Sequence, residues 1–267
     1  MIIPVDDPDD PRVAAYRDIR EKDLVGRQGR FIAEGEVVLR VLLGGSRHRP
    51  LSLLVAAKRT DKLAPMLAHV PEETPVYAAS QPVLDAVAGF HLHRGILALV
   101  ERGPEPSAGQ LLAALGPGPT VVMALSAIAN HDNMGGLFRN AAAFGVGAVL
   151  LDSECCDPLY RKAIRVSVGG VLRVPYARLA PGEDMLERLA AAGFQAVALS
   201  PAGELPLSRL VPPARPALLL GAEGPGLSQA LMARARTVSI PMAVGFDSLN
   251  VATAAGIALH HLTAERA

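Results

Sequence analysis

Cysteine and aromatic side chains are scarce in this chain of 267 residues, and tryptophan is absent. The two cysteines, Cys155 and Cys156, are adjacent and have no second pair, which argues against a disulfide framework and against a cysteine zinc site. So little cysteine is typical of a protein from a reducing compartment. We therefore expect no metal and a cytoplasmic location.

The chain also lacks an excess of charge and any long hydrophobic run. Its 26 basic and 26 acidic residues give a formal net charge of +0, so any electrostatic attraction to nucleic acid must be local. No stretch approaches the roughly 20 apolar residues of a membrane span. The N-terminal segment has neither the basic nor the apolar region of a signal peptide. These absences predict a soluble protein without a membrane partner.

What is present is a repeated alternation of apolar runs and helical patterns, interrupted once by proline and glycine. The break between Gly103 and Pro119 contains two Pro/Gly-rich stretches, where domain linkers concentrate. We predict an N-terminal domain at residues 1–102, with a polar arm or helix at 1–30. A linker at 103–119 then leads to a second domain at 120–267.

Both halves alternate strand and helix patterns, which predicts an α/β fold with a mostly parallel sheet in the second domain. The expected strands are 53–56, 76–78, 96–100, 121–125, 148–151, 196–199, 217–220 and 237–240. The expected helices are 37–42, 62–68, 81–88, 111–115, 134–144, 159–168, 184–192, 227–235 and one from 249 onward.

The most informative segment is the apolar run 217–220 with the glycine-rich loop that follows it. The loop spacing, Gly-x-x-Gly-x-Gly from Gly221 to Gly226, is neither a dinucleotide fingerprint nor a phosphate-binding Walker loop. Glycine lets a ligand approach the backbone closely, whereas the carboxylate of Glu223 would repel a phosphate. A ligand that has adenosine but no phosphate, such as S-adenosylmethionine, fits this loop better.

Two further segments are ambiguous when each is taken alone. Asn133 could cap a helix, and Arg139 could be an ordinary exposed helix residue. Ser248 is a good helix N-cap in the stretch after Ile240-Pro241-Met242. Beyond it, the small residues Ala252, Ala255 and Gly256 permit close packing of backbones.

In this order, the three segments resemble the motifs of the SpoU (TrmH-like) branch of the SPOUT methyltransferases, which methylate ribose 2′-hydroxyls in RNA. The first motif is Asn-x-Gly-x-x-x-Arg, the second Gly-x-Glu-Gly-x-Gly, and the third Ile-Pro-Met followed by Ser-Leu-Asn-Val. They are matched here by Asn133/Gly135/Arg139, by Gly221/Glu223/Gly224/Gly226, and by Ile240–Met242 with Ser248–Val251. The resemblance is close from about Thr120 to Leu262 and looser upstream.

The resemblance implies a C-terminal domain with a deep trefoil knot, a homodimer formed through that domain, and an N-terminal domain similar to RNA-binding ribosomal proteins. It implies that S-adenosylmethionine is held largely by backbone at Leu220, Gly221, Ile240 and Leu249. Arg139 would activate the ribose hydroxyl, as a literal base or by stabilising the developing alkoxide. The residues that would position substrate, loops and cofactor are Asn133, Glu223, Ser248 and Asn250. The small-residue face at Ala252, Ala255 and Gly256 would contribute to the dimer.

A local basic run is the strongest candidate for RNA contact. Arg161, Lys162 and Arg165 lie in a segment without an acidic residue between Asp157 and Glu183, and could hold RNA phosphates or form a solvated surface. The leading interpretation is an S-adenosylmethionine-dependent RNA 2′-O-methyltransferase acting on rRNA or tRNA. The alternatives are a non-catalytic RNA-binding protein on the same scaffold and a nucleotide-dependent oxidoreductase.

Overall fold

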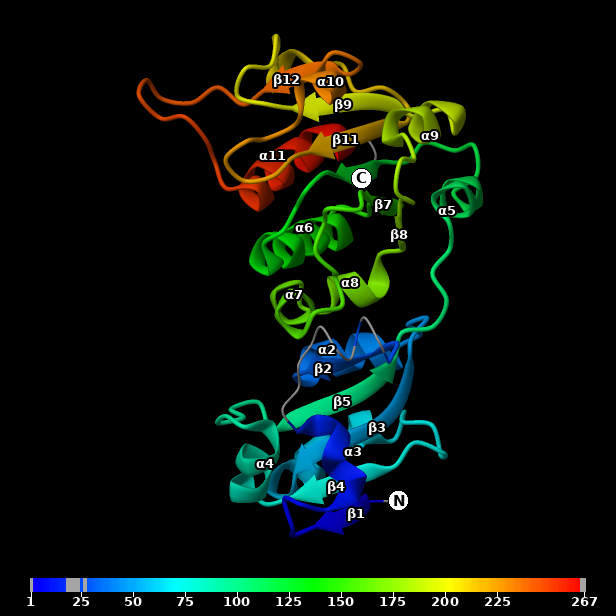
Figure 1. Ribbon diagram of the computed structural model, residues 1–267, viewed down its shortest axis with the longest axis vertical. Coiled ribbons are helices and arrows are strands. Elements are labelled where there is room, and N and C mark those ends of the chain that lie inside the picture. The colour runs from blue at the N-terminus through cyan, green and yellow to red at the C-terminus, as the bar shows by residue number, and fades with distance from the viewer. Residues whose placement is uncertain (1, 18–24, 26–27, 265–267) are drawn as a thin grey trace. The chain divides into compact units, whose positions relative to one another are not determined.

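The computed structural model describes residues 2–17, 25 and 28–264, and these divide into two compact units. Unit 1 comprises Met1–Pro104 and Leu159–Arg173, and unit 2 comprises Glu105–Pro158 and Val174–Ala267. Figure 1 shows a sheet with flanking helices in each unit.

Unit 1 is built on a mixed five-stranded sheet with the order β1-β4-β3-β5-β2. β1, β4 and β3 run parallel, while β5 is antiparallel to both β3 and β2. The elements are β1 (Ile2–Val5), the 3-10 helix η1 (Pro11–Tyr16), β2 (Arg30–Glu34), α2 (Glu36–Leu43), β3 (Arg49–Ala56), the 3-10 helix η2 (Ala57–Arg59), α3 (Thr60–Leu67), β4 (Val76–Ala79), α4 (Gln81–Ala88), β5 (Ile96–Glu101), α7 (Arg161–Val166) and α8 (Gly170–Arg173).

The N-terminal segment is part of the core of unit 1. Ile2–Val5 pairs with β4, and Tyr16 at the end of η1 is fully buried. The Tyr16 hydroxyl lies 2.8 Å from Ser52 Oγ and accepts a hydrogen bond from the Leu99 N–H. The polar arm or helix predicted at 1–30 thus contains an edge strand and a 3-10 helix that buries Val13 and Tyr16. Its remaining part at 18–24 and 26–27 lies outside the described residues.

Unit 2 is built on a seven-stranded sheet in which every strand pair is parallel, with the order β10-β12-β9-β11-β6-β7-β8. This confirms the predicted α/β fold with a parallel sheet. The elements are α5 (Ala108–Ala114), β6 (Val122–Leu125), α6 (His131–Ala143), β7 (Ala148–Leu151), β8 (Tyr176–Arg178), α9 (Met185–Ala191), β9 (Gln195–Leu199), β10 (Leu205–Pro206), the 3-10 helix η3 (Leu207–Arg209), β11 (Pro216–Leu220), α10 (Gln229–Met232), β12 (Arg236–Ser239) and α11 (Val251–Thr263).

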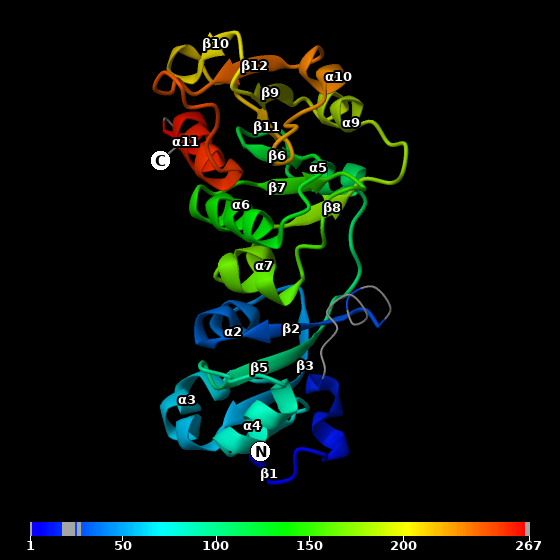
Figure 2. The ribbon, with the colours of Figure 1, turned by 60° about the vertical axis from the view of Figure 1, so that its left-hand side comes forward.

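The central strands of unit 2 are apolar because both of their faces are covered. Successive side chains of a strand point to opposite faces, and Ala217 and Leu219 join Leu111 and Leu189 in one core cluster beneath α5 and α9. On the opposite side, α6 and α11 pack against each other and α11 packs on β11 (Figure 2). A strand buried in this way reads as a continuous apolar run.

Two segments do not follow the predicted division of the chain into two domains at a linker of residues 103–119. α5 lies inside the predicted linker, capped reciprocally by Ser107 and Gln110, and its Leu111 and Leu112 are buried in the core of unit 2. Leu159–Arg173 clusters with unit 1, although it follows the first strands of unit 2 in sequence. The division into domains at 1–102 and 120–267 therefore stays a prediction.

Over the described part of the chain, no helix combines the length and apolarity needed to cross a membrane. Within the same residues, no group of three or more histidine, cysteine or acidic side chains is placed to hold a metal ion. The cytoplasmic location stays a prediction.

Candidate functional site

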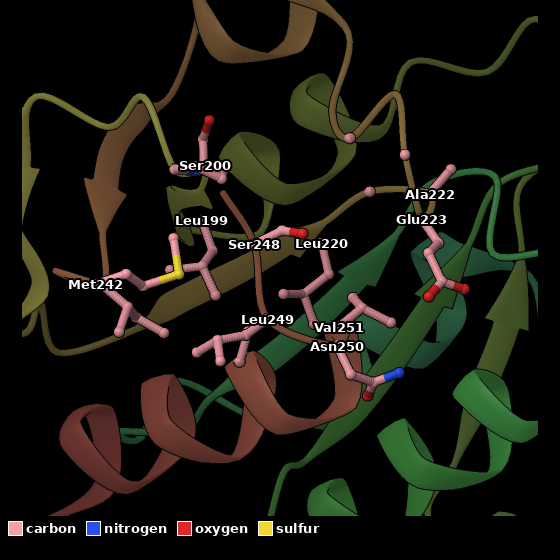
Figure 3. A pocket seen from close by; sticks show the side chains of 16 residues that line it. Leu199, Ser200, Leu220, Ala222, Glu223, Met242, Ser248, Leu249, Asn250 and Val251 are labelled. Carbon is pink, nitrogen blue, oxygen red and sulfur yellow. The ribbon is translucent and has the colours of Figure 1, made fainter. Parts of the chain in front are cut away.

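A pocket of about 280 Å³ lies at the carboxyl ends of β9, β11 and β12 in unit 2 (Figure 3). In open α/β sheets, ligands bind beyond the carboxyl ends of the strands, where the connecting loops can be shaped around them. The residues that line it are Leu199, Ser200, Pro201, Leu220, Gly221, Ala222, Glu223, Gly224, Gly226, Ile240, Met242, Ser248, Leu249, Asn250, Val251 and Ala254.

The glycine loop after β11 forms one wall of the pocket and folds back on itself. A Cβ at Gly221 would lie 2.3 Å from the Gly226 carbonyl carbon, so only glycine fits there. Gly224 and Gly226 have φ angles of +90° and +70°, a region that side chains disfavour. The Gly226 N–H closes the turn on the Ala222 carbonyl at 3.0 Å. The loop therefore presents backbone to a ligand in a fixed shape.

A chain of hydrogen bonds links the three sequence motifs at the edge of the pocket. Asn250 Nδ2 donates to Asn133 Oδ1 at 2.8 Å, and Asn133 Nδ2 donates to Glu223 Oε2 at 3.0 Å. Figure 3 shows the Glu223 and Asn250 side chains on this side of the pocket. Asn133 is buried, so its amide holds the other two side chains in place.

The orientation of both amides follows from hydrogen-bond chemistry. Asn250 Oδ1 accepts from the N–H groups of Ala252 and Thr253, so its NH₂ group must face Asn133. The Asn133 oxygen then faces Asn250, and the Asn133 NH₂ group is left to meet the Glu223 carboxylate. The network thus ends on the Glu223 carboxylate at the edge of the pocket.

Two helix caps differ from the sequence expectations. Asn130, rather than Asn133, caps α6 by accepting from the Asp132 and Asn133 N–H groups. Asn250, rather than Ser248, caps α11. The caps fall where the chain enters each helix, which leaves the Asn133 side chain free for Glu223 and Ser248 free to line the pocket.

The structure brings most of the predicted site residues together. The predicted cofactor residues Leu220, Gly221, Ile240 and Leu249 all line the pocket, as do Glu223, Ser248 and Asn250. Asn133 joins them through its two hydrogen bonds.

Arg139 is the exception among the predicted catalytic residues. It is exposed on α6 and is not one of the residues that line the pocket. The neighbouring Asn140 donates to the Ala252 carbonyl at 2.6 Å and so ties α6 to α11. In this chain, Arg139 therefore faces solvent.

Sequence reasoning missed the contribution of the β9 end. Leu199, Ser200 and Pro201 line the pocket, although no motif marks them. The signal available was the predicted strand at 196–199, since a parallel strand beside β11 must end at the same edge of the sheet.

The small residues of α11 pack against α6 of the same chain, and their expected contribution to a dimer stays a prediction. Ala252 packs so closely on α6 that a Cβ at Gly136 would lie 2.7 Å from the Ala252 Cβ. Ala255 is fully buried, and Gly256 lies beneath the Asn140 amide. Small residues here bring two helices of the same chain together.

The predicted RNA-binding residues all belong to α7 in unit 1 and differ in their surroundings. The Arg161 guanidinium lies over the Phe90 ring, 4.5 Å from its centroid, and 3.9 Å from the buried Glu34 carboxylate. Lys162 and Arg165 are exposed. Arg161 thus has a structural role within unit 1.

The electrostatics of the pocket are set by one group. Glu223 is the only charged residue among those that line it, and the rest of the described lining is apolar side chains, backbone, Ser200, Ser248 and Asn250. Neither Cys155 nor Cys156 lines the pocket, and burial raises the pKa of Cys155 to about 12 and that of Cys156 to about 11. The pocket suits a ligand that is largely apolar and carries positive charge.

Comparison with known proteins gives one family. Residues 120–260 match the SpoU rRNA Methylase family. A protein of Mycobacterium bovis described as an uncharacterized tRNA/rRNA methyltransferase is 44% identical over 266 residues, which is 96% of this chain and 90% of that protein.

Solved structures of similar proteins cover both units. The AdoMet-bound rRNA methyltransferase of Sinorhizobium meliloti has a TM-score of 0.83 at 24% identity, covering 99% of this chain and 98% of its own. The SpoU methyltransferase AviRb of Streptomyces viridochromogenes, solved in complex with AdoMet, has a TM-score of 0.76 at 25% identity and 96% coverage of both chains.

Proposed function

The chain belongs to the SpoU rRNA methylase family, and from this premise we propose that it transfers a methyl group from S-adenosylmethionine to a ribose 2′-hydroxyl of rRNA or tRNA. The observation that carries the proposal is the pocket beyond β9, β11 and β12, with Glu223 as its single charged residue. AdoMet is bound in the related structures from Sinorhizobium meliloti and Streptomyces viridochromogenes.

The residues of this pocket fit S-adenosylmethionine better than a phosphate-bearing cofactor. When bound, the cofactor supplies a methyl group activated by a sulfonium cation. The Glu223 carboxylate attracts such a cation and repels a nucleotide pyrophosphate. The glycine loop offers backbone groups to the adenine and ribose, and Leu220 and Leu249 provide apolar surface.

The side chains of the motifs position the reaction without a metal ion. Asn133 and Asn250 hold Glu223 at the edge of the pocket, and the Ser248 hydroxyl faces the same space. We assign Arg139 to the RNA side of the reaction. A guanidinium stays protonated in proteins, so Arg139 orients the substrate and stabilises the developing alkoxide, and the hydroxyl proton passes to solvent water.

Three further features complete the proposal. The C-terminal part of the chain forms a deep trefoil knot and a homodimer, and the N-terminal part selects RNA. Support for a protein contact in unit 2 comes from the exposed apolar side chains of Val244, Phe246 and Ile257. Exposed large apolar side chains are a feature of interaction surfaces.

Transfer of labelled methyl groups tests the proposed function. Purified protein is incubated with methyl-labelled S-adenosylmethionine and with rRNA or tRNA from a strain that lacks the gene, and label in RNA is counted. We expect incorporation by the wild type. We expect a loss of at least a hundredfold for Arg139→Ala with cofactor affinity within a few-fold of wild type, because Arg139 does not line the pocket.

The competing functions give different results in the same experiment. RNA binding without incorporation would indicate a non-catalytic RNA-binding protein. Bound nicotinamide in the purified protein, with no affinity for S-adenosylmethionine, would indicate an oxidoreductase. Near-normal turnover in Arg139→Ala would reject the role given to that residue.

A further inference from the structure

A second pocket, of about 470 Å³, lies within unit 1 and has no part in cofactor binding. Four elements form it: the first turn of α2, the 3-10 helix η2, the loop before β5 and the end of α7. The residues that line it are Glu36, Val37, Val38, Arg59, His93, Arg94, Arg165 and Val168. All of them belong to unit 1.

The pocket has an excess of positive charge. Its lining contains three arginines and one acid, Glu36. That carboxylate is already paired twice, with Arg40 at 2.6 Å and with Arg59 at 3.2 Å. Among the described residues, no ion pair is found for Arg94 or Arg165, and both are exposed. Two guanidinium groups are therefore available to an anion.

The backbone of the pocket adds to this preference. The N-cap of α2 is Gly35, which has no side chain to cap the helix, and residues 36–38 of the first turn line the pocket. The N–H groups and dipole at a helix N-terminus favour an anion. Glu36 occupies the first helical position, but its carboxylate is paired with both Arg40 and Arg59. It therefore repels a bound anion only weakly.

One of the two available guanidinium groups lies close to the start of α2. The Arg94 side chain crosses directly over Gly35, where an added Cβ would lie 2.9 Å from both Arg94 Cδ and Nη1. The Arg94 main-chain carbonyl is held by the Arg59 guanidinium. The Arg94 guanidinium therefore lies beside the N-terminus of α2, where both can meet the same anion.

We propose that this pocket binds a backbone phosphate of the RNA substrate, through Arg94 and Arg165 and the first turn of α2. The proposal rests on the proposed function, since the substrate of an RNA methyltransferase carries a phosphate at every internucleotide linkage. Arginine donors match phosphate oxygens in geometry and charge. The contact positions the RNA and carries no base specificity.

The salt dependence of RNA binding tests the pocket. Full-length wild type, Arg94→Gln and Arg165→Gln are titrated with rRNA and tRNA fractions by filter binding at several KCl concentrations. Each variant is expected to bind about three- to tenfold more weakly. The slope of log affinity against log salt should fall by about 0.7 to 0.9 for a lost phosphate contact. Lys62→Gln, an exposed lysine on α3 outside the pocket, is the matched control.

Two measurements separate this proposal from its rivals. Calorimetry should give wild-type affinity for S-adenosylmethionine in all variants, because their residues lie outside the cofactor pocket. Titration with inorganic phosphate should give only weak binding. Tight phosphate binding with unchanged RNA slopes would show a free-phosphate site and overturn the assignment to RNA.

The failure of this proposal can be told from the failure of the proposed function. If the wild type methylates RNA while Arg94→Gln and Arg165→Gln bind it as Lys62→Gln does, the pocket does not hold a phosphate and the function stands. If the salt slopes of Arg94→Gln and Arg165→Gln are lower than the wild-type slope as expected, but the wild type transfers no methyl group, the pocket stands and the function falls.

Discussion

At the scale of single residues, the site depends on side chains whose hydrogen bonds leave one choice of orientation. Asn250 caps α11 with its oxygen, so its NH₂ group fixes Asn133, and Asn133 in turn fixes Glu223. The result is a carboxylate held at the rim of an otherwise uncharged pocket.

The charge of Glu223 gives a prediction about ligand preference. Glu223→Gln keeps an oxygen that can accept from Asn133 but removes the charge that attracts a sulfonium. We expect the affinity for S-adenosylmethionine to fall roughly three- to tenfold, as for a partly solvated charge pair. The neutral thioether S-adenosylhomocysteine should bind with little change. Calorimetry with both ligands measures the difference; an equal loss for the two would contradict an electrostatic role.

His48 in unit 1 gives a prediction about pH. Burial, with the nearby Arg47 as a smaller cause, lowers the pKa of His48 from 6.5 to about 4. The neutral ring is satisfied in the fold: Nδ1 lies 2.6 Å from the Arg102 carbonyl, and Nε2 accepts from Arg47 Nε. Between pH 6.5 and 4, His48 binds a proton more readily in the unfolded chain than in the folded one. The stability that the neutral His48 ring contributes is therefore fully present above pH 6.5 and is lost as the pH falls towards 4.

The loss should amount to roughly 3 kcal/mol by pH 4. His48→Gln keeps a donor and an acceptor but cannot titrate. Thermal unfolding of both proteins from pH 7.5 to 4.5 should show the wild-type midpoint falling more steeply than that of the variant. Parallel curves would mean that His48 is not held neutral by the fold.

At the scale of elements, the loop after β11 is the part of the site that tolerates least change. Gly221→Ala would force its Cβ onto the backbone of Gly226 and Leu227, which no rotamer can relieve. We expect at least a tenfold loss of S-adenosylmethionine affinity and a lower unfolding temperature, because the loop must move. Calorimetry and thermal unfolding measure the two effects.

Gly109→Ala is the control for this change. Gly109 lies in α5 with open space at its Cβ position, so alanine should raise helix stability by about 0.5–1 kcal/mol and leave the cofactor site unchanged. If Gly221→Ala behaved like Gly109→Ala, the closed shape of the loop would not matter for binding.

Much of the element order could be predicted from the sequence because the buried parallel strands are apolar on both faces. The strand predicted at 217–220 is β11, Pro216–Leu220, and the helix predicted at 81–88 is α4, Gln81–Ala88. Edge strands escaped prediction. β1 contains Pro4, which argues against a strand except at an edge, and β8 has only three residues after Pro175.

Site residues that belong to a sequence motif could be predicted. Site residues that only the folded arrangement brings to the pocket could not. Glu223 and Asn250 belong to motifs, and both line the pocket. Ser200 enters because β9 ends beside β11, which requires the strand order. The exposure of Arg139 depends on how α6 packs against the rest of unit 2. The motif that contains Arg139 does not predict it.

At the scale of the whole molecule, the two units have different chemistry although the chain has a formal net charge of +0. Unit 2 has a largely apolar pocket with one carboxylate, which suits a cationic cofactor. Unit 1 has a basic pocket with two available guanidinium groups, which suits RNA phosphate. The net charge of the whole chain does not show this difference between the pockets, because it sums the charges of both units.

In the proposed function, the methyl group ends on a ribose oxygen of RNA. The most direct measurement follows the labelled methyl group after complete alkaline hydrolysis of the product RNA. Alkaline cleavage needs a free 2′-hydroxyl beside the phosphodiester, so a 2′-O-methylated nucleotide stays joined to its neighbour. We predict that the label is found in alkali-stable dinucleotides. Label found in mononucleotides would show methylation of a base and contradict the account.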